Sequence, residues 1–174
     1  MDQQHRSQAG FSLVETIMGI GVLTVGALGM AGVFAAGVQK MVSSPNELIA
    51  TQKATEAIES VFSARDSHTV AWAGLRNVSA GGIFLDGPQP LKLDGLDGVV
   101  NTADDGAVET IVLPGRDQIL DTADDVTQTL DGFTREIRIV DLSADLRSVT
   151  VTITYHAGPS IRSYTLTAYI STFA

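Results

Sequence analysis

The chain contains one almost unbroken apolar run, from Phe11 to Val38, and this run limits the folds open to it. A helix rises about 1.5 Å per residue, so roughly 28 residues reach about 42 Å. The hydrocarbon core of a bilayer is only about 30 Å thick, so the run can span a membrane as one helix. One carboxylate, Glu15, lies near its start, where a charge costs a few kcal/mol unless it is paired. Glu15 is therefore a candidate functional residue.

The residues around Glu15 form a signal with a fixed order. A polar leader, MDQQHRSQAG, ends in Gly10, and Phe-Ser-Leu-Val-Glu follows at the head of the apolar run. This order resembles the class III signal of type IV prepilins and pseudopilins. In that family a membrane-embedded aspartyl peptidase cuts after the glycine and methylates the new N-terminus. The resemblance implies cleavage between Gly10 and Phe11, and it implies that Glu15 pairs with the amine of Phe11 on a neighbouring subunit.

Three glycines in the apolar run indicate which type of pilin the chain resembles. Gly26, Gly29 and Gly32 lie in the stretch VLTVGALGMAG, which is similar to the same region in minor pilins of the PilV type. Glycine weakens a helix in water but lets helices approach closely in lipid. The resemblance implies a structural subunit that assembles into a type IV pilus or primes its assembly. Two alternatives remain: a type II secretion pseudopilin, and a tip-exposed binding pilin with metal-stabilised loops.

The resemblance also implies a location and partners. We expect a single-pass protein of the inner membrane, with a cytoplasmic N-terminus and a periplasmic head, that later enters the filament. The leader's single basic residue, Arg6, is offset by Asp2, so this orientation depends on the resemblance and not on loop charge. The expected partners are a prepilin peptidase, other pilin subunits and the membrane.

Beyond the apolar run, the pattern changes to that of a half-buried helix. Pro45 either kinks or divides the helix, because proline removes a hydrogen bond and disfavours helix at the residue before it. An apolar stripe at helical spacing follows and ends near residues 64–67. We expect this stripe to pack on a sheet; its members are Leu48, Ile49, Ala54, Ala57, Ile58, Val61 and Phe62.

The C-terminal third predicts the sheet. Around residues 137–139, 149–155 and 164–170, apolar residues alternate with polar ones, which is typical of an antiparallel meander. Shorter strands are expected at residues 82–85 and 108–113. The fold class is α+β: the type IV pilin fold, with a long N-terminal helix on an antiparallel sheet. The expected regions are residues 1–10 (leader), 11–40 (membrane helix), 41–67 (amphipathic helix), 68–133 (connecting loops) and 134–174 (sheet).

An acidic motif occurs twice between helix and sheet. GLDGVVNTADD begins at Gly95, and GRDQILDTADD begins at Gly115. Like charges at this density repel, and oxygen ligands suit a hard divalent cation such as calcium. The spacing is not that of an EF-hand, however, and the alternative is a solvated loop in which Asp and Thr cap turns. The candidate calcium ligands are Asp97, Asn101, Asp104, Asp105, Asp117, Asp121, Asp124 and Asp125.

Composition narrows the remaining function classes. The formal net charge is -9 and only 11 residues are Lys or Arg, which argues against nucleic acid as a partner. There is no cysteine, so thiolate chemistry and disulfides are excluded. His5, His68 and His156 have no spacing that suggests a metal triad, and no nucleophile and base stand together. We therefore expect no enzymatic activity and no required cofactor, with calcium as the one candidate ion.

Overall fold

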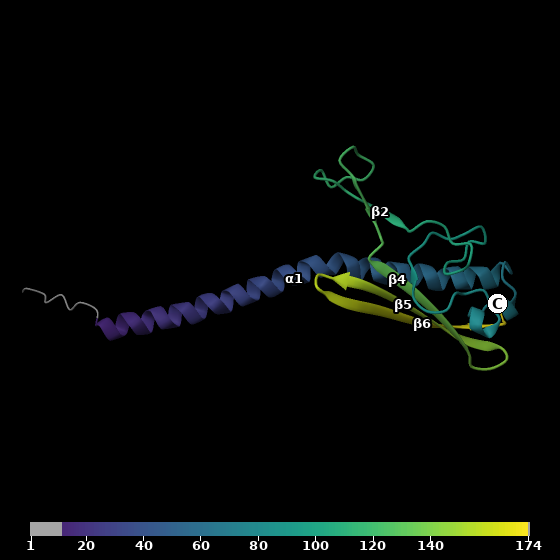
Figure 1. The fold of residues 1–174 in the computed structure, drawn as a ribbon, viewed down its shortest axis with the longest axis horizontal. Coiled ribbons are helices and arrows are strands. Elements are labelled where there is room, and N and C mark those ends of the chain that lie inside the picture. Colours follow the sequence, from purple (N-terminus) through teal and green to yellow (C-terminus); the bar gives the residue numbers. More distant parts are fainter. Residues whose placement is uncertain (1–11, 174) are drawn as a thin grey trace, which may run out of the picture. The chain divides into compact units, whose positions relative to one another are not determined.

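The computed structural model describes the backbone of residues 12–173, and the side chains of that range apart from residues 39–44. The chain divides into two compact units, Met1–Val42 and Ser43–Ala174. One helix, α1 (Leu13–Asp66), runs through both (Figure 1). It continues past Pro45, so a division of the helix there, one of the two predicted outcomes, is wrong. A proline inside a helix removes only one hydrogen bond, and the bonds on both sides persist.

The second unit contains an antiparallel sheet of four strands in the order β1-β4-β5-β6. Its three long strands are β4 (Phe133–Asp141), β5 (Leu146–Ala157) and β6 (Ser160–Ser171). Ile137 lies opposite Val151, which in turn lies opposite Leu166, so the apolar phases of the strands share one face. The predicted meander is confirmed. The short strand β1 (Gln89–Pro90), which pairs with β4, was not predicted.

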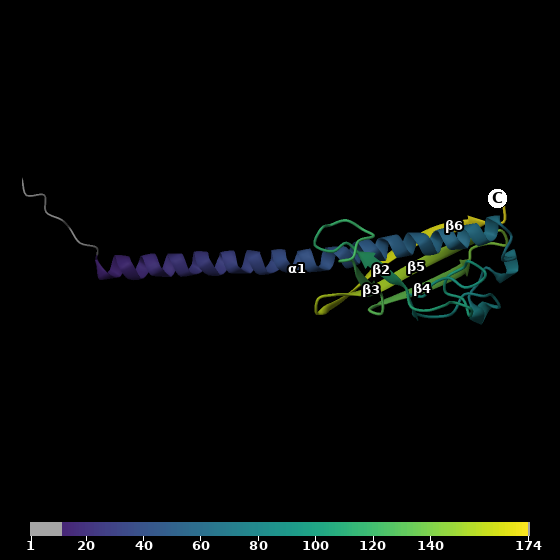
Figure 2. The same ribbon diagram turned by 90° about the horizontal axis from the view of Figure 1, so that it is seen from above.

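The C-terminal half of α1 packs on this sheet (Figure 2). Small side chains dominate the buried face of the helix, which lets its backbone approach the strands closely: Ala50, Ala54, Ala57, Ile58, Val61 and Ala64 are buried. Ile49 and Phe62 flank this face and are partly buried. Leu48, predicted to lie in the stripe, is instead 71% exposed. The protein is thus an α+β chain whose long apolar helix precedes an antiparallel sheet that covers its second half.

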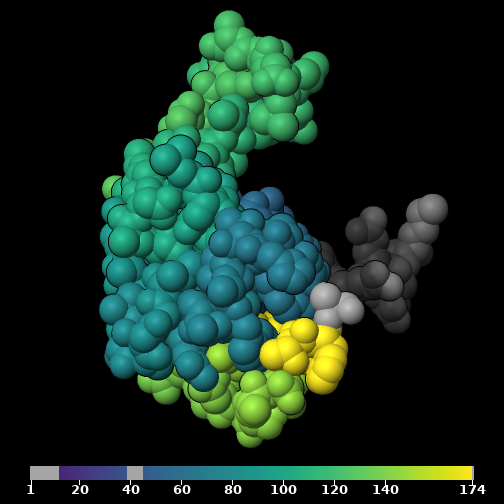
Figure 3. Space-filling model, turned by 90° about the vertical axis from the view of Figure 1, so that its right-hand side faces the viewer, coloured from purple at the N-terminus to yellow at the C-terminus, as the bar shows by residue number. Residues whose placement is uncertain are grey.

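The connection from α1 to β4 contains two short 3-10 helices, η1 (Trp72–Gly74) and η2 (Val78–Ala80), and the hairpin β2 (Thr110–Leu113) with β3 (Val126–Thr129). The strand expected at residues 108–113 is therefore present in part. The one expected at residues 82–85 is not a strand, because Phe84 forms only an isolated bridge with Asn77. The β2-β3 hairpin carries the second acidic loop away from the sheet, as the green arm in Figure 3 shows.

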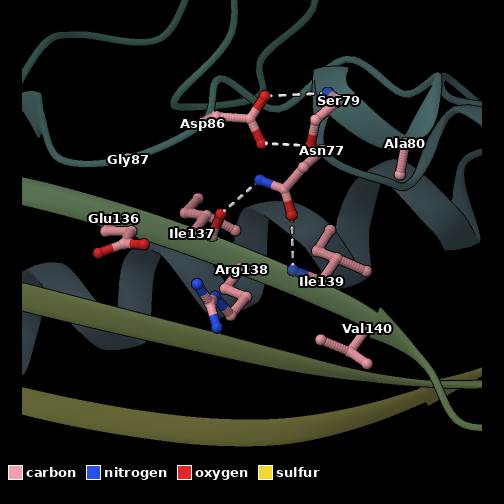
Figure 4. Close-up of a pocket in the computed structure, with 10 residues that line it drawn as sticks. All are labelled: Asn77, Ser79, Ala80, Asp86, Gly87, Glu136, Ile137, Arg138, Ile139 and Val140. Atoms are coloured by element: carbon pink, nitrogen blue, oxygen red, sulfur yellow. Dashed lines mark hydrogen bonds between the residues drawn. The ribbon is translucent and has the colours of Figure 1, made fainter.

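Asn77 stands in for a missing strand at the outer edge of β4. Its Nδ2 donates to the carbonyl of Ile137 at 2.7 Å, and its Oδ1 accepts from the amide of Ile139 at 2.8 Å (Figure 4). Beside it, Asp86 accepts hydrogen bonds from the amide and the hydroxyl of Ser79. The side-chain amide therefore satisfies two backbone groups that would otherwise need a neighbouring strand.

Replacing Asn77 with alanine is expected to lower the free energy of unfolding by about 1–3 kcal/mol, because two buried backbone groups lose their partners. Urea unfolding of the full chain in mild detergent, followed by Trp72 fluorescence, measures the change. Ser79→Ala, which removes only an exposed hydroxyl contact, is the matched control and should cost less than about 0.5 kcal/mol. Equal effects from the two variants would contradict the edge-capping role of Asn77.

Candidate functional site

The first candidate site is the exposed apolar part of α1. Residues Leu13–Val38 form a helix long and apolar enough to cross a membrane, and none of its side chains is buried. The hydroxyls of Thr16 and Thr24 donate to the carbonyls four residues earlier, so they need no outside partner. Glu15 is the only charged residue in this stretch and lies in the first turn of the helix. Over the 26 residues from Leu13 to Val38, the carboxylate of Glu15 is therefore the one charged group on the helix surface.

The processing residues of the predicted signal, Gly10 and Phe11, lie outside the described residues. Glu15 is exposed, at the helix N-terminus, where unpaired backbone amides favour a negative charge. An amine next to this position would meet both a carboxylate and an apolar helix. A carboxylate exposed in this way can pair with a positively charged group of another molecule.

The second candidate site is the pair of acidic loops, beginning with the loop from Gly95 to Asp105. Asp104 accepts from the amide of Leu96 at 2.9 Å and from the hydroxyl of Thr102 at 2.7 Å. Asp105 accepts from the amides of Asn101 and Thr102 at 2.8 and 3.2 Å. Asp97 accepts from the amide of Val99. The carboxylates therefore fold back on their own loop and close it through its backbone donors.

The loop from Gly115 to Asp125 repeats this pattern at every step. Asp124 accepts from the amide of Arg116 at 2.6 Å and from the hydroxyl of Thr122 at 2.8 Å. Asp125 accepts from the amides of Asp121 and Thr122 at 2.7 and 3.2 Å. The repeat in the sequence is thus a repeat in structure. No hydrogen bond between described residues joins the two loops.

Glycine is required at the start of each loop. A Cβ built on Gly95 would lie 2.3 Å from Cγ of Asp104, and one built on Gly115 would lie 2.3 Å from Cγ of Asp124. Such distances are far below van der Waals contact. The two aspartates can therefore reach across their loops only because a glycine stands opposite each of them.

These hydrogen bonds lower the pKa of two carboxyls. The Thr102 hydroxyl, together with amides of the loop, holds the pKa of Asp104 below its usual value, and Thr122 does the same for the pKa of Asp124. A carboxyl with a lowered pKa stabilises the fold above the ordinary aspartate pKa, and this contribution is lost as the pH falls through the lower, folded value. Protonation of Asp104 and Asp124 in acid therefore removes a contribution that favours the closed loops.

The structure brings the candidate calcium ligands together only within each loop. No group of three or more His, Asp or Glu side chains in the described part of the chain is placed to hold a metal ion. Both oxygens of Asp104 and Asp105 already accept hydrogen bonds within their loop. The geometry therefore follows the turn-capping alternative, and calcium binding stays a prediction for experiment.

If calcium does join the loop carboxylates, millimolar calcium should raise the midpoint of thermal unfolding and excess EDTA should reverse the rise. A ligand present at 100 times its dissociation constant stabilises by about 2.7 kcal/mol, which is several degrees for a head of this size. Circular dichroism of the full chain in detergent measures the midpoint, and magnesium at equal concentration serves as the control. A midpoint that changes with neither calcium nor EDTA would contradict calcium binding. The loops would then be held by their hydrogen bonds.

A buried ion network, which the sequence analysis did not single out, ties the first loop to the head. Arg135 on β4 is fully buried, and its guanidinium lies 3.5 Å from Glu109 and 3.9 Å from Asp105. Lys53 on α1 lies 2.6 Å from Glu109 and 2.5 Å from Glu56. Helix, loop and strand therefore meet at one cluster of charges. The signal for it was Arg135 itself, which occupies an inward position in the alternation of β4.

The charges in this network offset the cost of burial. Burial lowers the pKa of Arg135, while the negative charges of Glu109 and Asp105 oppose that shift. Burial would also lower the pKa of Lys53, but its hydrogen bonds to Glu109 and Glu56 outweigh this, and the pKa is raised. Both basic groups therefore stay charged at neutral pH. The network therefore acts as a structural clamp between α1, the first acidic loop and β4.

A second buried arginine holds the other end of the sheet. Arg147 on β5 donates to the carbonyls of Trp72 and Leu75, and its guanidinium lies 4.0 Å from the centre of the Trp72 ring. Asp141 accepts from Arg147 and pairs with Arg76, and these two hydrogen bonds lower the pKa of Asp141. Trp72 is therefore part of a structural cation-π contact.

No known protein family, no curated protein and no solved structure matches the chain. Function must therefore be argued from the chain's own residues.

Proposed function

We propose that the chain is a structural subunit of a type IV pilus, a minor pilin of the PilV type. It is made as a prepilin, cleaved after Gly10, methylated at Phe11 and packed into a filament through its N-terminal helix. One observation carries the proposal. A helix of membrane length exposes all its side chains over Leu13–Val38, and its single charge, Glu15, lies in the first turn. Such a helix suits insertion in the membrane first and packing against the same helix of neighbouring subunits in the filament afterwards.

The glycines of the helix support this role. A Cβ added to Gly26, Gly29 or Gly32 would meet nothing within 4 Å, so the chain's own fold does not require glycine there. Glycine costs about 1 kcal/mol relative to alanine in a helix, and close approach of another helix is the usual compensation in lipid. Neighbouring subunits would supply that helix.

The second unit, Ser43–Ala174, supports the same role because its sheet covers only the second half of α1. The second half of α1 is buried under a four-stranded sheet, while the first half has no cover among the described residues. Helix and sheet in this order are the arrangement expected of the type IV pilin fold. The head is held together by buried arginines and apolar packing, and no catalytic constellation is needed for a role in assembly.

Processing of the leader provides the first test. When the chain is made together with a prepilin peptidase, its mass should fall by residues 1–10 and rise by one methyl group on Phe11. Gly10→Val should leave the leader attached, because the peptidase requires a small residue at the cut. Ala9→Val adds bulk one residue earlier and is the matched control, which should still be cleaved. Equal cleavage of both variants, or none of the native chain, would contradict the proposal.

A further inference from the structure

The β5-β6 turn, residues 156–162, lies at the end of the second unit where α1 enters it. Nδ2 of Asn46, near the start of this unit, donates to the carbonyl of His156 at 2.8 Å. At the other end of the helix, Arg65 donates to the carbonyl of Ser171 at 3.4 Å. The helix and β6 therefore run in the same direction, and the β5-β6 turn lies on the side from which α1 comes (Figures 1 and 2).

The chain that links this end of the unit to the candidate membrane span is short. The span covers Leu13–Val38, and residues 39–46 continue the same helix as far as Asn46. These residues cover about 12 Å at a rise of about 1.5 Å each. The headgroup layer of a bilayer takes up about 5–7 Å of that distance, and a tilt of the helix, the usual response when a span is longer than the hydrocarbon core, shortens it further. The phospholipid headgroups are therefore within reach of the β5-β6 turn.

The hairpin of β5 and β6 is free of acidic residues in an otherwise acidic chain. The formal net charge is -9, yet residues 146–174 contain no Asp or Glu. Arg162 in the turn is exposed and forms no salt bridge with the described residues. Its charge is balanced by the exposed Glu47 on α1, while the arm with the second acidic loop stands on the other side of α1 (Figure 3). A guanidinium in such a place can pair with a lipid phosphate.

The β5-β6 turn also presents apolar groups to solvent. Ile161 is 68% exposed and lies opposite the exposed His156. Pro159 is exposed at the tip and has no amide hydrogen that would need a partner. An isoleucine and a proline next to an arginine suit the boundary between headgroups and acyl chains, where apolar and basic groups both find partners.

We propose that the β5-β6 turn is a contact site for the surface of the membrane that α1 spans. Ile161 and Pro159 lie against the headgroup boundary, and Arg162 pairs with a lipid phosphate. Every chain holds this surface on its own short tether, so that a weak contact is well populated, because tethered groups meet at effective concentrations of about millimolar. A second copy of the chain has no such link to the turn. The proposal rests on the proposed membrane anchoring and not on assembly into a filament.

Quenching of a fluorescent label by lipid headgroups tests this contact. The chain has no cysteine, so Ser160→Cys directs a bimane label to the turn alone. The full chain is reconstituted in phosphatidylcholine vesicles in which a small fraction of the lipids carries a nitroxide on the headgroup. Ser143→Cys, an exposed position in the opposite turn of the sheet, is the matched control. Quenching should be at least about threefold stronger at position 160, because the 12 residues of β5 separate the two turns by about 40 Å.

Two substitutions separate contact from nearness. Ile161→Ser removes the apolar side chain and Arg162→Glu reverses the charge, so each should at least halve the quenching at position 160. Leu142→Ser and Arg138→Glu make the same changes at exposed positions outside the turn and should leave the quenching unchanged. Thermal unfolding should not shift in any of the four, because their side chains are exposed. Quenching that is insensitive to both turn variants would overturn the proposal.

Dilution and flotation of the same vesicles separate the remaining explanations. Quenching at position 160 should stay constant when the ratio of chain to lipid is lowered severalfold, because the contact joins one chain to its own membrane. A change on dilution would assign the turn to a second copy and overturn the proposal. A chain that does not float with the vesicles would overturn the membrane anchoring itself, whereas a chain that floats without quenching at position 160 would overturn the contact alone.

Discussion

Replacing Arg135 with leucine is expected to lower the free energy of unfolding by about 3–5 kcal/mol, the usual cost of removing one partner from a buried ion pair. The guanidinium is fully buried, and its loss leaves Asp105 without its ion pair and Glu109 with Lys53 alone. The carbonyl of Lys92 and the side chain of Asn101 lose a donor as well. Because a small domain is stable by only about 5–15 kcal/mol, the variant should be close to unfolding.

Arg138→Leu is the matched control, since it makes the same change on the same strand at an exposed position. Its effect should stay within about 0.5 kcal/mol. Urea unfolding of the two variants in detergent, followed by Trp72 fluorescence, makes the comparison. Similar losses for both arginines would mean that the network around Arg135 contributes little.

The second large effect is expected in assembly. Glu15→Ala should leave membrane insertion and removal of the leader intact but reduce incorporation into filaments at least about tenfold, which corresponds to about 1.4 kcal/mol. The reason is electrostatic, because an ion pair at the head of an apolar helix lies in a medium of low dielectric constant, where an unpaired amine is costly. Quantitative immunoblotting of sheared filaments against the membrane fraction measures the ratio.

Glu15→Gln is the control that separates charge from shape. It keeps the size of the side chain and one acceptor oxygen but removes the charge. If the ion pair with a neighbouring N-terminus is the reason, glutamine should assemble as poorly as alanine. Normal incorporation of both variants would contradict a docking role for Glu15.

The parts of the fold that the sequence predicted are those with a long, regular pattern. The apolar run predicted a helix of membrane length, and three stretches of period-two alternation predicted β4, β5 and β6. Patterns of this length depend on burial of a whole face and outweigh local exceptions. The strands β1 and β3 were missed because two and four residues carry too little pattern. Of the two outcomes expected at Pro45, a kink or a division, the division is wrong, since one lost hydrogen bond does not end a helix of 54 residues.

The sites were harder to predict, because they depend on what surrounds the residues. The repeat in the sequence indicated two equivalent loops, and their internal hydrogen bonds are equivalent. The first loop is bonded to the rest of the structure through Arg135 and Leu85, which are distant from each other in sequence and come together only in the fold. In the alternation of β4, Arg135 occupies a position where an apolar residue is expected. A charged residue at such a position indicates that it has buried partners of opposite charge.

The most direct test of the proposed function is whether the chain is part of a surface filament. Filaments sheared from cells that make the full chain at its native level should contain it, and mass spectrometry of that filament-bound chain should find N-methylated Phe11 at its N-terminus. Retention of the whole population in the membrane, or filament-bound chains that still carry residues 1–10, would contradict the account.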